Sequence, residues 1–390
     1  MDQKLDFNSE PWLQQRTYAR IDLAALRHNF RAYKPYMHPG TGFMSVIKAD
    51  AYGHGAVPCG RVAIEEGATM LAVAALSEAV ILREAGLTEI PVFILGRTDP
   101  ALTEYLLHYD LVQTVIDYQS GLEYAKAAAK YGKTLKVHIK LDTGMTRIGF
   151  STTPDEIRKS ADEICDLKTQ KALELEGMFT HLATAESDPA YATFQYQSYR
   201  KMEQLLAEKD ITFKYRHMCN SAGMILYPEM QMNLVRPGIT QYGSYPTEAF
   251  KKILPLKPVM NLYSHVVQTR EIAPDTGVSY GLRWKSQDKS RLAVVPIGYA
   301  DGLHRLLSNR ASFLINGQLA PVVGSICMDR CMVDISQIPE VKVGDRVLIF
   351  GADETGGIPA ELVAEQAETI SYEIFCAVSP RVMRVYRDEK

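Results

Sequence analysis

The 390-residue sequence has no excess of charge of either sign, because 43 lysines and arginines oppose 46 aspartates and glutamates, a net charge of −3. That balance offers no basic surface for nucleic-acid phosphates, so we expect no nucleic-acid partner. No apolar run is long enough to span a membrane, and the most apolar stretch, residues 70–82, is interrupted by Ser77 and Glu78. The chain does not open with a basic segment followed by an apolar one, so we expect a cytoplasmic protein without a membrane anchor.

Cysteine is also scarce, and the six cysteines are irregularly spaced. Cys327 and Cys331 are close together, but no second pair of cysteines or histidines at metal-ligand spacing accompanies them. The HExxH and P-loop motifs are missing, as is a GxGxxG that follows a strand. We therefore expect reduced thiols, no bound metal and no nucleotide site of these kinds.

What the chain does have, over its first two-thirds, is a regular alternation of short apolar runs with helical patterns. Such runs, separated by helices, indicate parallel strands that are covered on both faces. Eight of these units predict an α/β fold, a (β/α)₈ TIM-type barrel over residues 13–245. The predicted strands are residues 44–48, 71–75, 92–96, 111–116, 135–141, 175–181, 214–219 and 233–237.

Residues that typically begin and end helices support this alternation. After the second predicted strand, Ser77 is placed to cap the amino end of a helix, and Gly86 is placed to end that helix in a left-handed conformation. Residues 77–86 are therefore predicted to be helical.

The pattern changes after residue 245. The segment 244–258 contains three prolines and mixed charges and is typical of a linker. Short strand-like runs come next, separated by turn residues such as Asn316 and Gly317. We expect a mainly antiparallel β domain over residues 246–390, which residues 1–12 could join.

Polar residues that could carry chemistry stand at the carboxyl ends of the predicted barrel strands, where barrel enzymes place their reacting groups. A single lysine or arginine there is usually a solvated rim residue, and a histidine there is as often structural. Several of them on one face would converge on one mouth. They are Lys48, Arg147, His181, Asn220, Ser221 and Arg236.

The motifs around these positions resemble the alanine racemase family. In order along the chain they are KADAYGHG (48–55), KxDTGMxRxG (140–149), HxATA (181–185), NSA (220–222), RxGI (236–239), GVSYG (277–281), GYADG (298–302), CMD (327–329) and YE (372–373). NSA or CMD alone would be uninformative, but KADAYGHG together with GVSYG and CMD is specific. The resemblance implies a barrel that binds pyridoxal 5'-phosphate (PLP), followed by a β domain. It also implies a head-to-tail homodimer with shared active sites and alanine as the substrate.

Racemisation removes the α-proton from one face of an amino acid and returns one to the other, so it needs an electron sink and two bases. By resemblance, Lys48 holds PLP as a Schiff base and is the base on the D side. Tyr280 of the other subunit is the opposing base. A phenol with a pKa near 10 is a poor base, and the resemblance supplies a hydrogen-bonded chain from Tyr280 through His181 to Arg236. Arg236 also faces the pyridine nitrogen and, because it keeps its proton, leaves that nitrogen neutral.

The resemblance implies roles for the remaining motif residues as well. The phosphate contacts are Ser221, the amides of Gly238 and Ile239, and the hydroxyls of Tyr52 and Tyr372, with Asn220 also near the cofactor. Arg147 and the amide of Met328 contact the substrate carboxylate, and Lys140 occupies a position that is often carbamylated. Supporting positions near the approach to the site are Asp329, Tyr299 and Arg305.

Three departures from the family pattern are Glu186 in place of aspartate, Ser325 in place of arginine and Met383 in place of proline. The first two bear on selectivity, so a racemase of serine or of broader specificity stays open. Basic amino-acid decarboxylases share a related barrel but lack the GVSYG and CMD context. Non-catalytic PLP-binding barrel proteins lack the second domain that carries Tyr280.

Overall fold

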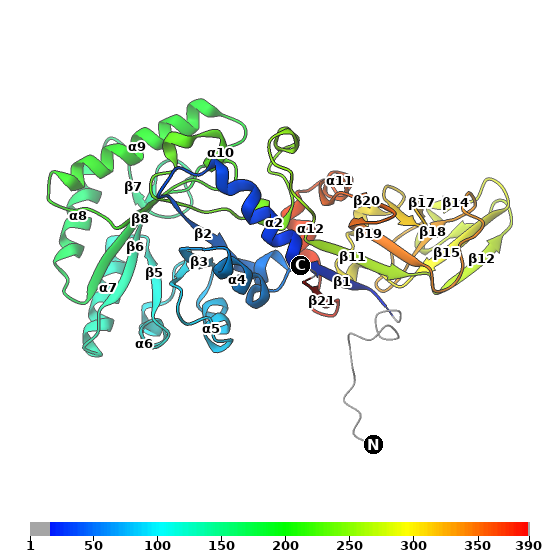
Figure 1. Cartoon of the computed structure of the whole chain (residues 1–390), viewed down its shortest axis with the longest axis horizontal. Coiled ribbons are helices and arrows are strands. Elements are labelled where there is room, and N and C mark those ends of the chain that lie inside the picture. The colour runs from blue at the N-terminus through cyan, green and yellow to red at the C-terminus, as the bar shows by residue number, and fades with distance from the viewer. Residues whose placement is uncertain (1–15, 389–390) are drawn as a thin grey trace, which may run out of the picture.

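The computed structural model describes residues 16–388, which form two parts joined side by side (Figure 1). A parallel barrel surrounded by helices occupies one end of an elongated molecule. A domain of antiparallel strands, the β domain, occupies the other end. Residues 1–12, which could join the predicted β domain, lie outside the described part of the chain.

The barrel contains all eight predicted strands, in the order β10-β2-β3-β4-β5-β6-β8-β9, and every neighbouring pair is parallel. Every residue of β3, β4 and β5 is buried, which explains why these strands read as continuous apolar runs. The amide of Arg236 donates to the carbonyl of Cys219 at 2.9 Å, which links the ends of the sheet. The bounds are β2 (Gly42–Val46), β3 (Met70–Val73), β4 (Val92–Ile94), β5 (Leu111–Val115), β6 (Leu135–Asp142), β8 (Leu173–Phe179), β9 (Tyr215–His217) and β10 (Leu234–Val235).

Helices connect these strands and cover the outside of the barrel (Figure 1). The amino ends of several are capped by aspartates, such as Asp117, whose carboxylate accepts from the amide of Ser120 at 2.7 Å. A short strand, β7 (Phe150–Ser151), pairs with β6 and is absent from the predicted strands. The helices are α2 (Leu23–Tyr33), α3 (Lys48–Tyr52), α4 (Ala56–Glu65), α5 (Leu76–Glu84), α6 (Thr103–His108), α7 (Tyr118–Lys130), α8 (Ile157–Thr169), α9 (Pro189–Ala207) and α10 (Gly223–Leu226).

One predicted helix start is wrong. Helix α5 begins at Leu76, so Ser77 is its second residue rather than its cap. The carboxylate of Glu78 does the capping, because it accepts from the amide of Ala74 at 2.7 Å. The predicted end is confirmed, since Gly86 comes just after the helix in a left-handed conformation with φ +87°.

The β domain is mainly antiparallel, as predicted. Its large sheet has the order β12-β15-β18-β17-β16-β19-β11-β1-β21, with β20 paired to β19, and β13 and β14 form a separate hairpin. The bounds are β11 (Met260–His265), β12 (Gln268–Ile272), β13 (Gly277–Val278), β14 (Trp284–Lys285), β15 (Ser290–Val295), β16 (Ser312–Ile315), β17 (Gln318–Val323), β18 (Cys331–Asp334), β19 (Arg346–Asp353), β20 (Gly356–Ile358), α11 (Ala360–Gln366), α12 (Ser371–Ala377) and β21 (Met383–Arg387).

The first strand of the chain belongs to this second sheet. Strand β1 (Tyr18–Asp22) pairs antiparallel with β11 and parallel with β21. The predicted division assigns these residues to the barrel, whereas β1 pairs with the β domain. Pairing partners so distant along the chain leave no local signal in the sequence.

Helix α12 joins the two parts (Figure 1). The ring of Tyr372, on this helix, lies 5.5 Å from that of Tyr52 in the barrel. The ring of Phe375 packs edge-on against His54 at 5.0 Å. The β domain therefore contributes side chains to the barrel mouth of its own chain. Within residues 16–388, no helix is long and apolar enough to cross a membrane.

Candidate active site

A cavity of about 490 Å³ opens at the carboxyl end of the barrel strands. Side chains from α3, the loops after β6, β8, β9 and β10, and helix α12 line it. Most of the predicted functional residues meet there, namely Lys48, Tyr52, Lys140, Arg147, His181, Asn220, Ser221, Arg236, Gly238, Ile239 and Tyr372.

The cavity is cationic. Lys48, Lys140, Arg147 and Arg236 line it, and none of the described lining residues is an aspartate or glutamate. A cavity of this charge suits a small molecule with negative groups, such as a phosphate or a carboxylate. Burial lowers the pKa of Lys48, and the neighbouring Arg147 lowers it further. A larger fraction of the Lys48 amine is therefore neutral, as a nucleophilic amine requires.

Lys48 is held at the start of a left-handed turn. Residues 49–52 all have positive φ, from 52° at Ala49 to 55° at Ala51. For residues with a side chain this conformation costs about 1–2 kcal/mol each. The carboxylate of Glu78 offsets part of that cost by accepting from the amide of Ala49 at 2.6 Å. Strain of this kind persists where the surroundings fix it, commonly at functional sites.

The turn brings Tyr52 against the backbone at Gly238. A Cβ at Gly238 would lie 2.9 Å from the hydroxyl of Tyr52, so only glycine leaves the hydroxyl this close. The amide of Gly238 donates to Ser221 Oγ at 2.9 Å, and the hydroxyl of Thr240 donates to the same oxygen at 3.1 Å. Burial raises the pKa of Tyr52 and of Tyr372, so both remain hydroxyl donors. Hydroxyls and amides gathered without an acid fit a phosphate group.

Arg236 is buried at the base of the cavity. It donates to the Nδ1 atoms of His217 at 2.8 Å and of His181 at 3.1 Å, and to the carbonyls of Thr180 and Met218. Burial lowers the pKa of His181 well below its ordinary value, and Arg236 lowers it further. His181 is therefore neutral, and since its Nδ1 accepts, its proton is on Nε2.

Lys140 is a second lysine in the cavity and is almost fully buried. Its Nζ donates to the carbonyl of Leu141 at 2.8 Å. Burial, followed by Arg236 and Arg147, lowers its pKa to about 7. Lys140 therefore loses its proton far more readily than an exposed lysine does.

The remaining predicted residues lie outside the cavity of their own chain, on the β domain. They are Tyr280, Tyr299, Arg305, Met328 and Asp329. Tyr280 lies between β13 and β14, and β14 is in the part of the β domain remote from the barrel (Figure 1).

These β-domain residues are unusually exposed for their size. Tyr280 is 72% exposed, Met328 52% and Tyr299 45%. Ser325, one of the departures from the family pattern, contacts the backbone of Tyr280, because its hydroxyl donates to the Tyr280 carbonyl at 2.8 Å. Large apolar side chains exposed together are typical of a surface that another molecule covers.

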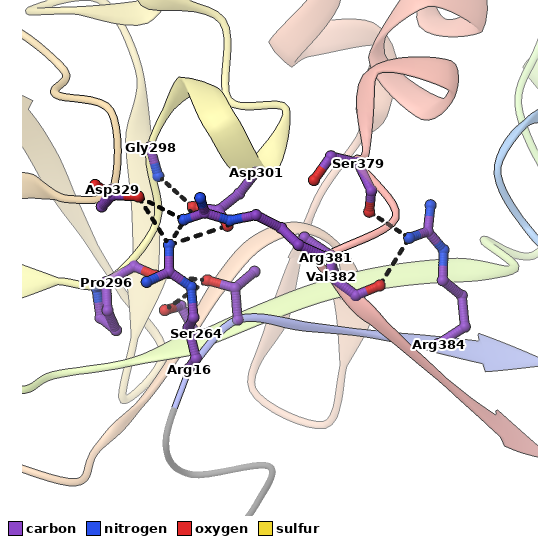
Figure 2. Close-up of polar contacts among 11 residues, drawn as sticks. Arg16, Ser264, Pro296, Gly298, Asp301, Asp329, Ser379, Arg381, Val382 and Arg384 are labelled. Atoms are coloured by element: carbon purple, nitrogen blue, oxygen red, sulfur yellow. Dashed lines mark hydrogen bonds and ion pairs between the residues drawn. The ribbon is translucent and has the colours of Figure 1, made fainter. Parts of the chain in front are cut away.

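An ionic cluster joins the loop of Tyr299 to the loop of Met328 (Figure 2). The fully buried carboxylate of Asp301 accepts from Arg16 at 2.9 Å and from Arg381 at 2.7 Å. Arg381 also binds Asp329 at 2.6 Å. The amide of Tyr299 donates to the carbonyl of Cys327 at 3.1 Å, so the two loops form one unit.

Replacing Asp301 by alanine is expected to lower the free energy of unfolding by about 2–3 kcal/mol. Breaking a buried ion pair costs about 3–5 kcal/mol, but Arg16 and Arg381 are partly exposed and would recover some hydration. Chemical denaturation measures this. The matched control is Asp329→Ala, which removes a half-exposed carboxylate from the same cluster and is expected to cost under about 1 kcal/mol. Equal costs would contradict a central role for Asp301.

Sequence reasoning missed three residues that position the site: Glu78, His217 and Asp301. Glu78 has a local signal, because an acid at the third position of a helix is typical of a capping box. His217 has none, and Asp301 stands in the GYADG motif, which does not indicate its ion pairs. Their partners, Arg236 and Arg381, are far from them along the chain.

A parallel barrel with a cationic mouth, a buried lysine amine and an attached antiparallel β domain defines a two-domain barrel enzyme that binds an anionic cofactor or substrate. Among residues 16–388, no group of histidine, cysteine and acidic residues could hold a metal ion.

Comparisons with known proteins define the family. Residues 21–246 match the model of the alanine racemase N-terminal domain, and residues 259–386 match that of the C-terminal domain. An alanine racemase of Desulfovibrio desulfuricans is 43% identical over 370 residues, covering 95% of this chain and 97% of that protein. The chain belongs to the alanine racemase family, whose members interconvert L- and D-alanine with PLP.

Solved structures agree. The alanine racemase of Clostridium difficile 630 is 38% identical with a TM-score of 0.91, and 96% of each chain is covered. An alanine racemase from Bartonella henselae with covalently bound pyridoxal phosphate is 27% identical with a TM-score of 0.84, covering 95% of this chain and 99% of that one.

Proposed function

We propose that this alanine racemase works as a homodimer in which each active site takes one base from each subunit. Lys48 would serve one face of the substrate and Tyr280 of the partner subunit the other. The observation that carries the proposal is the separation of the two residues within one chain. Lys48 lines the cavity, whereas Tyr280 is 72% exposed on the β domain. The cytoplasmic location expected from the sequence stays a prediction.

The residues that line the cavity support a specific place for each part of PLP. The Lys48 amine would hold its aldehyde carbon, and Arg236 would face its ring nitrogen. Ser221, the Gly238 amide and the Tyr52 hydroxyl lie close together and would hold its phosphate. When bound, PLP supplies the electron sink that stabilises negative charge at the substrate α-carbon.

The two bases would carry out the proton transfers. Lys48 Nζ would take or return the α-proton on one face, and Oη of Tyr280 of the partner subunit would do so on the other. The lowered pKa of Lys48 supports the first role. For the second, His181 has its proton on Nε2 and its Nδ1 bonded to Arg236 at 3.1 Å. His181 Nε2 is thus available to hydrogen-bond the oxygen of that tyrosine.

Arg236 would also limit side reactions. It keeps its proton near neutral pH, because burial lowers its pKa only to about 10. A donor of this kind hydrogen-bonds the ring nitrogen without protonating it. With Arg236 as the partner of the ring nitrogen, charge withdrawal from the α-carbon would be only moderate.

Arg147 and the Met328 amide of the partner subunit would hold the substrate carboxylate. Tyr372 and the partner's Met328 would lie beside it and would leave little space for a side chain, which would favour alanine. The test is D-amino-acid formation by the purified holoenzyme from L-alanine, L-serine and L-lysine. We expect kcat/KM for alanine to exceed that for serine by about 10- to 100-fold.

Other outcomes of this assay would change the proposal. Equal turnover of serine would make the enzyme a racemase of broader specificity. Bound PLP without turnover of any amino acid would overturn the two-base proposal and favour a non-catalytic PLP-binding protein.

Lys140 is expected to carry a carbamate. Its pKa of about 7 leaves a neutral amine that can add CO₂ and release a proton, forming an anion beside Arg147. This change replaces repulsion between two cations by attraction. The expected result is a carbamate ¹³C NMR signal after equilibration with ¹³C-bicarbonate, absent in Lys140→Met. Lys48→Met is the matched control and should retain the signal. Spectra that are the same for wild type and Lys140→Met would contradict the assignment.

A further inference from the structure

A line of polar side chains runs from Arg236 through the interior of the barrel, away from the cavity. Arg236 Nη1 lies 2.8 Å from His217 Nδ1, and His217 Nε2 lies 2.9 Å from His138 Nδ1. His138 Nε2 lies 3.8 Å from Glu176 Oε2. Glu176 in turn binds Lys214 at 3.0 Å, at the amino end of β9. The line thus connects the cavity to the opposite end of the barrel.

The protons on this line can be assigned from Arg236 outward. A guanidinium only donates, so His217 Nδ1 must accept and the proton of His217 is on Nε2. His217 Nε2 then donates to His138 Nδ1, which places the proton of His138 on Nε2. That N–H lies too far from Glu176 for a direct hydrogen bond but close enough for charge–dipole attraction. Every donor therefore points from Arg236 toward Glu176.

The fold makes specific room for His138. The register of β6 against β8 shifts between Val137, which pairs with Leu175, and His138, which pairs with Gly177, so Glu176 on β8 has no partner on β6. A Cβ at Gly177, on β8, would lie 2.7 Å from the His138 ring. The ring therefore fits only against a glycine. A register shift and a glycine at the same point indicate that the fold accommodates the His138 ring specifically, rather than as ordinary core packing.

The two imidazoles lie in apolar surroundings. Phe179 stacks on His217 with ring centres 4.8 Å apart, and Phe93 packs 4.6 Å from His138. Both imidazoles are fully buried, and burial lowers the pKa of each, so both are neutral. Burial raises the pKa of Glu176, but the N–H of His138 and the ammonium of Lys214 outweigh it and lower that pKa. A negative charge therefore stands at the far end of the line.

We propose that His138 and Glu176 are positioning residues for Arg236. They would fix His217 in the tautomer that accepts from Arg236, because the Glu176 carboxylate favours the His138 tautomer with its proton on Nε2. None of the described hydrogen-bond partners of Arg236 is a carboxylate, since they are imidazoles and backbone carbonyls. The consequence for catalysis rests on the proposed function, because there Arg236 faces the cofactor ring.

Cutting the line should displace Arg236. Without an acceptor at position 138, His217 can place its proton on Nδ1, facing an Arg236 N–H. Two donors then oppose each other, and Arg236 moves from its position. The absorption spectrum of bound PLP, which depends on the group facing the ring nitrogen, changes with it.

The tautomers can be read directly by ¹⁵N NMR of the holoenzyme labelled in its histidine rings. His138→Asn and His217→Asn assign the two signals. We expect both rings to be neutral with the proton on Nε2 at about pH 8, above the ordinary pKa of histidine. A proton on Nδ1 of either ring, or a doubly protonated ring, would overturn the proposal whatever the activity of the enzyme.

Three variants of strand β6 test the effect on the site. His138→Leu removes the acceptor, and we expect an altered spectrum of bound PLP and a kcat about tenfold lower with little change in KM. His138→Asn can still place an acceptor near Nδ1 and should recover most of both. Ile139→Ala, a buried neighbour outside the line, is the control for lost stability and should leave the spectrum and kcat unchanged. An unaltered His138→Leu spectrum would contradict the proposal.

Two further variants complete the design. If His138→Leu does not fold, Glu176→Gln removes the charge while keeping the shape, and it should shift the spectrum in the same direction; no shift would overturn the proposal. Arg236→Lys distinguishes the proposed place of Arg236 at the cofactor from the proposed positioning role of His138 and Glu176. A spectrum unaffected by Arg236→Lys would refute the proposed place of Arg236 at the cofactor. A spectrum that changes with Arg236→Lys but not with His138→Leu would refute the positioning role alone.

Discussion

Replacing Tyr280 by alanine is expected to lower proton abstraction from L-alanine by about 10²- to 10⁴-fold, the usual contribution of a positioned general base. Abstraction from D-alanine should fall by less than about tenfold, because Lys48 serves that face. PLP binding should be unchanged, since Tyr280 lies outside the cavity of its own chain and is 72% exposed. The two enantiomers therefore respond differently to one substitution.

The measurement is loss of α-deuterium from each deuterated enantiomer, followed by proton NMR. The matched control is Leu282→Ala, which removes another exposed apolar side chain, 57% accessible, from the same hairpin. This control should affect both enantiomers alike and slightly. Equal losses for L- and D-alanine in Tyr280→Ala would contradict the assignment of Tyr280 to one face.

Replacing Lys48 by alanine is expected to abolish racemisation in both directions, by at least about 10⁴-fold. The substitution removes both the covalent attachment of PLP and the base on one face, and a general base alone contributes up to about 10⁴-fold. The cavity keeps the cations Arg147 and Arg236, so PLP should still bind non-covalently.

Lys48→Arg is the control for charge. It keeps a cation at the mouth but offers no neutral amine near neutral pH, so it should be as inactive as Lys48→Ala. After borohydride reduction of the wild-type holoenzyme, peptide mapping should find the cofactor on Lys48. A reduced cofactor on Lys140, the other lysine of the cavity, would overturn the assignment.

The barrel can be predicted from the sequence because buried parallel strands read as continuous apolar runs. The exact strand ends cannot. The sequence pattern places Lys48 and His181 at the last positions of strands, but β2 ends at Val46 and β8 at Phe179. Both side chains lie beyond the strand ends, which is why they reach the cavity.

The site is predictable only in part. Motif resemblance identifies the residues that line the cavity, but not how they are held. The left-handed turn after Lys48 depends on Glu78, which approaches from the next strand–helix unit. Asp301 is held by Arg16, 285 residues away. Contacts between such distant residues leave no pattern at helix or strand spacing.

Mixing two inactive variants, Lys48→Ala and Tyr280→Ala, tests the shared site most directly. A mixed dimer has one mouth with both bases and one with neither. If subunits exchange freely, half of the dimers are mixed and half of their sites are intact, so about one quarter of wild-type activity should return. Each variant alone should stay inactive. Verified subunit exchange without recovery of activity would contradict the proposal that each active site takes one base from each subunit.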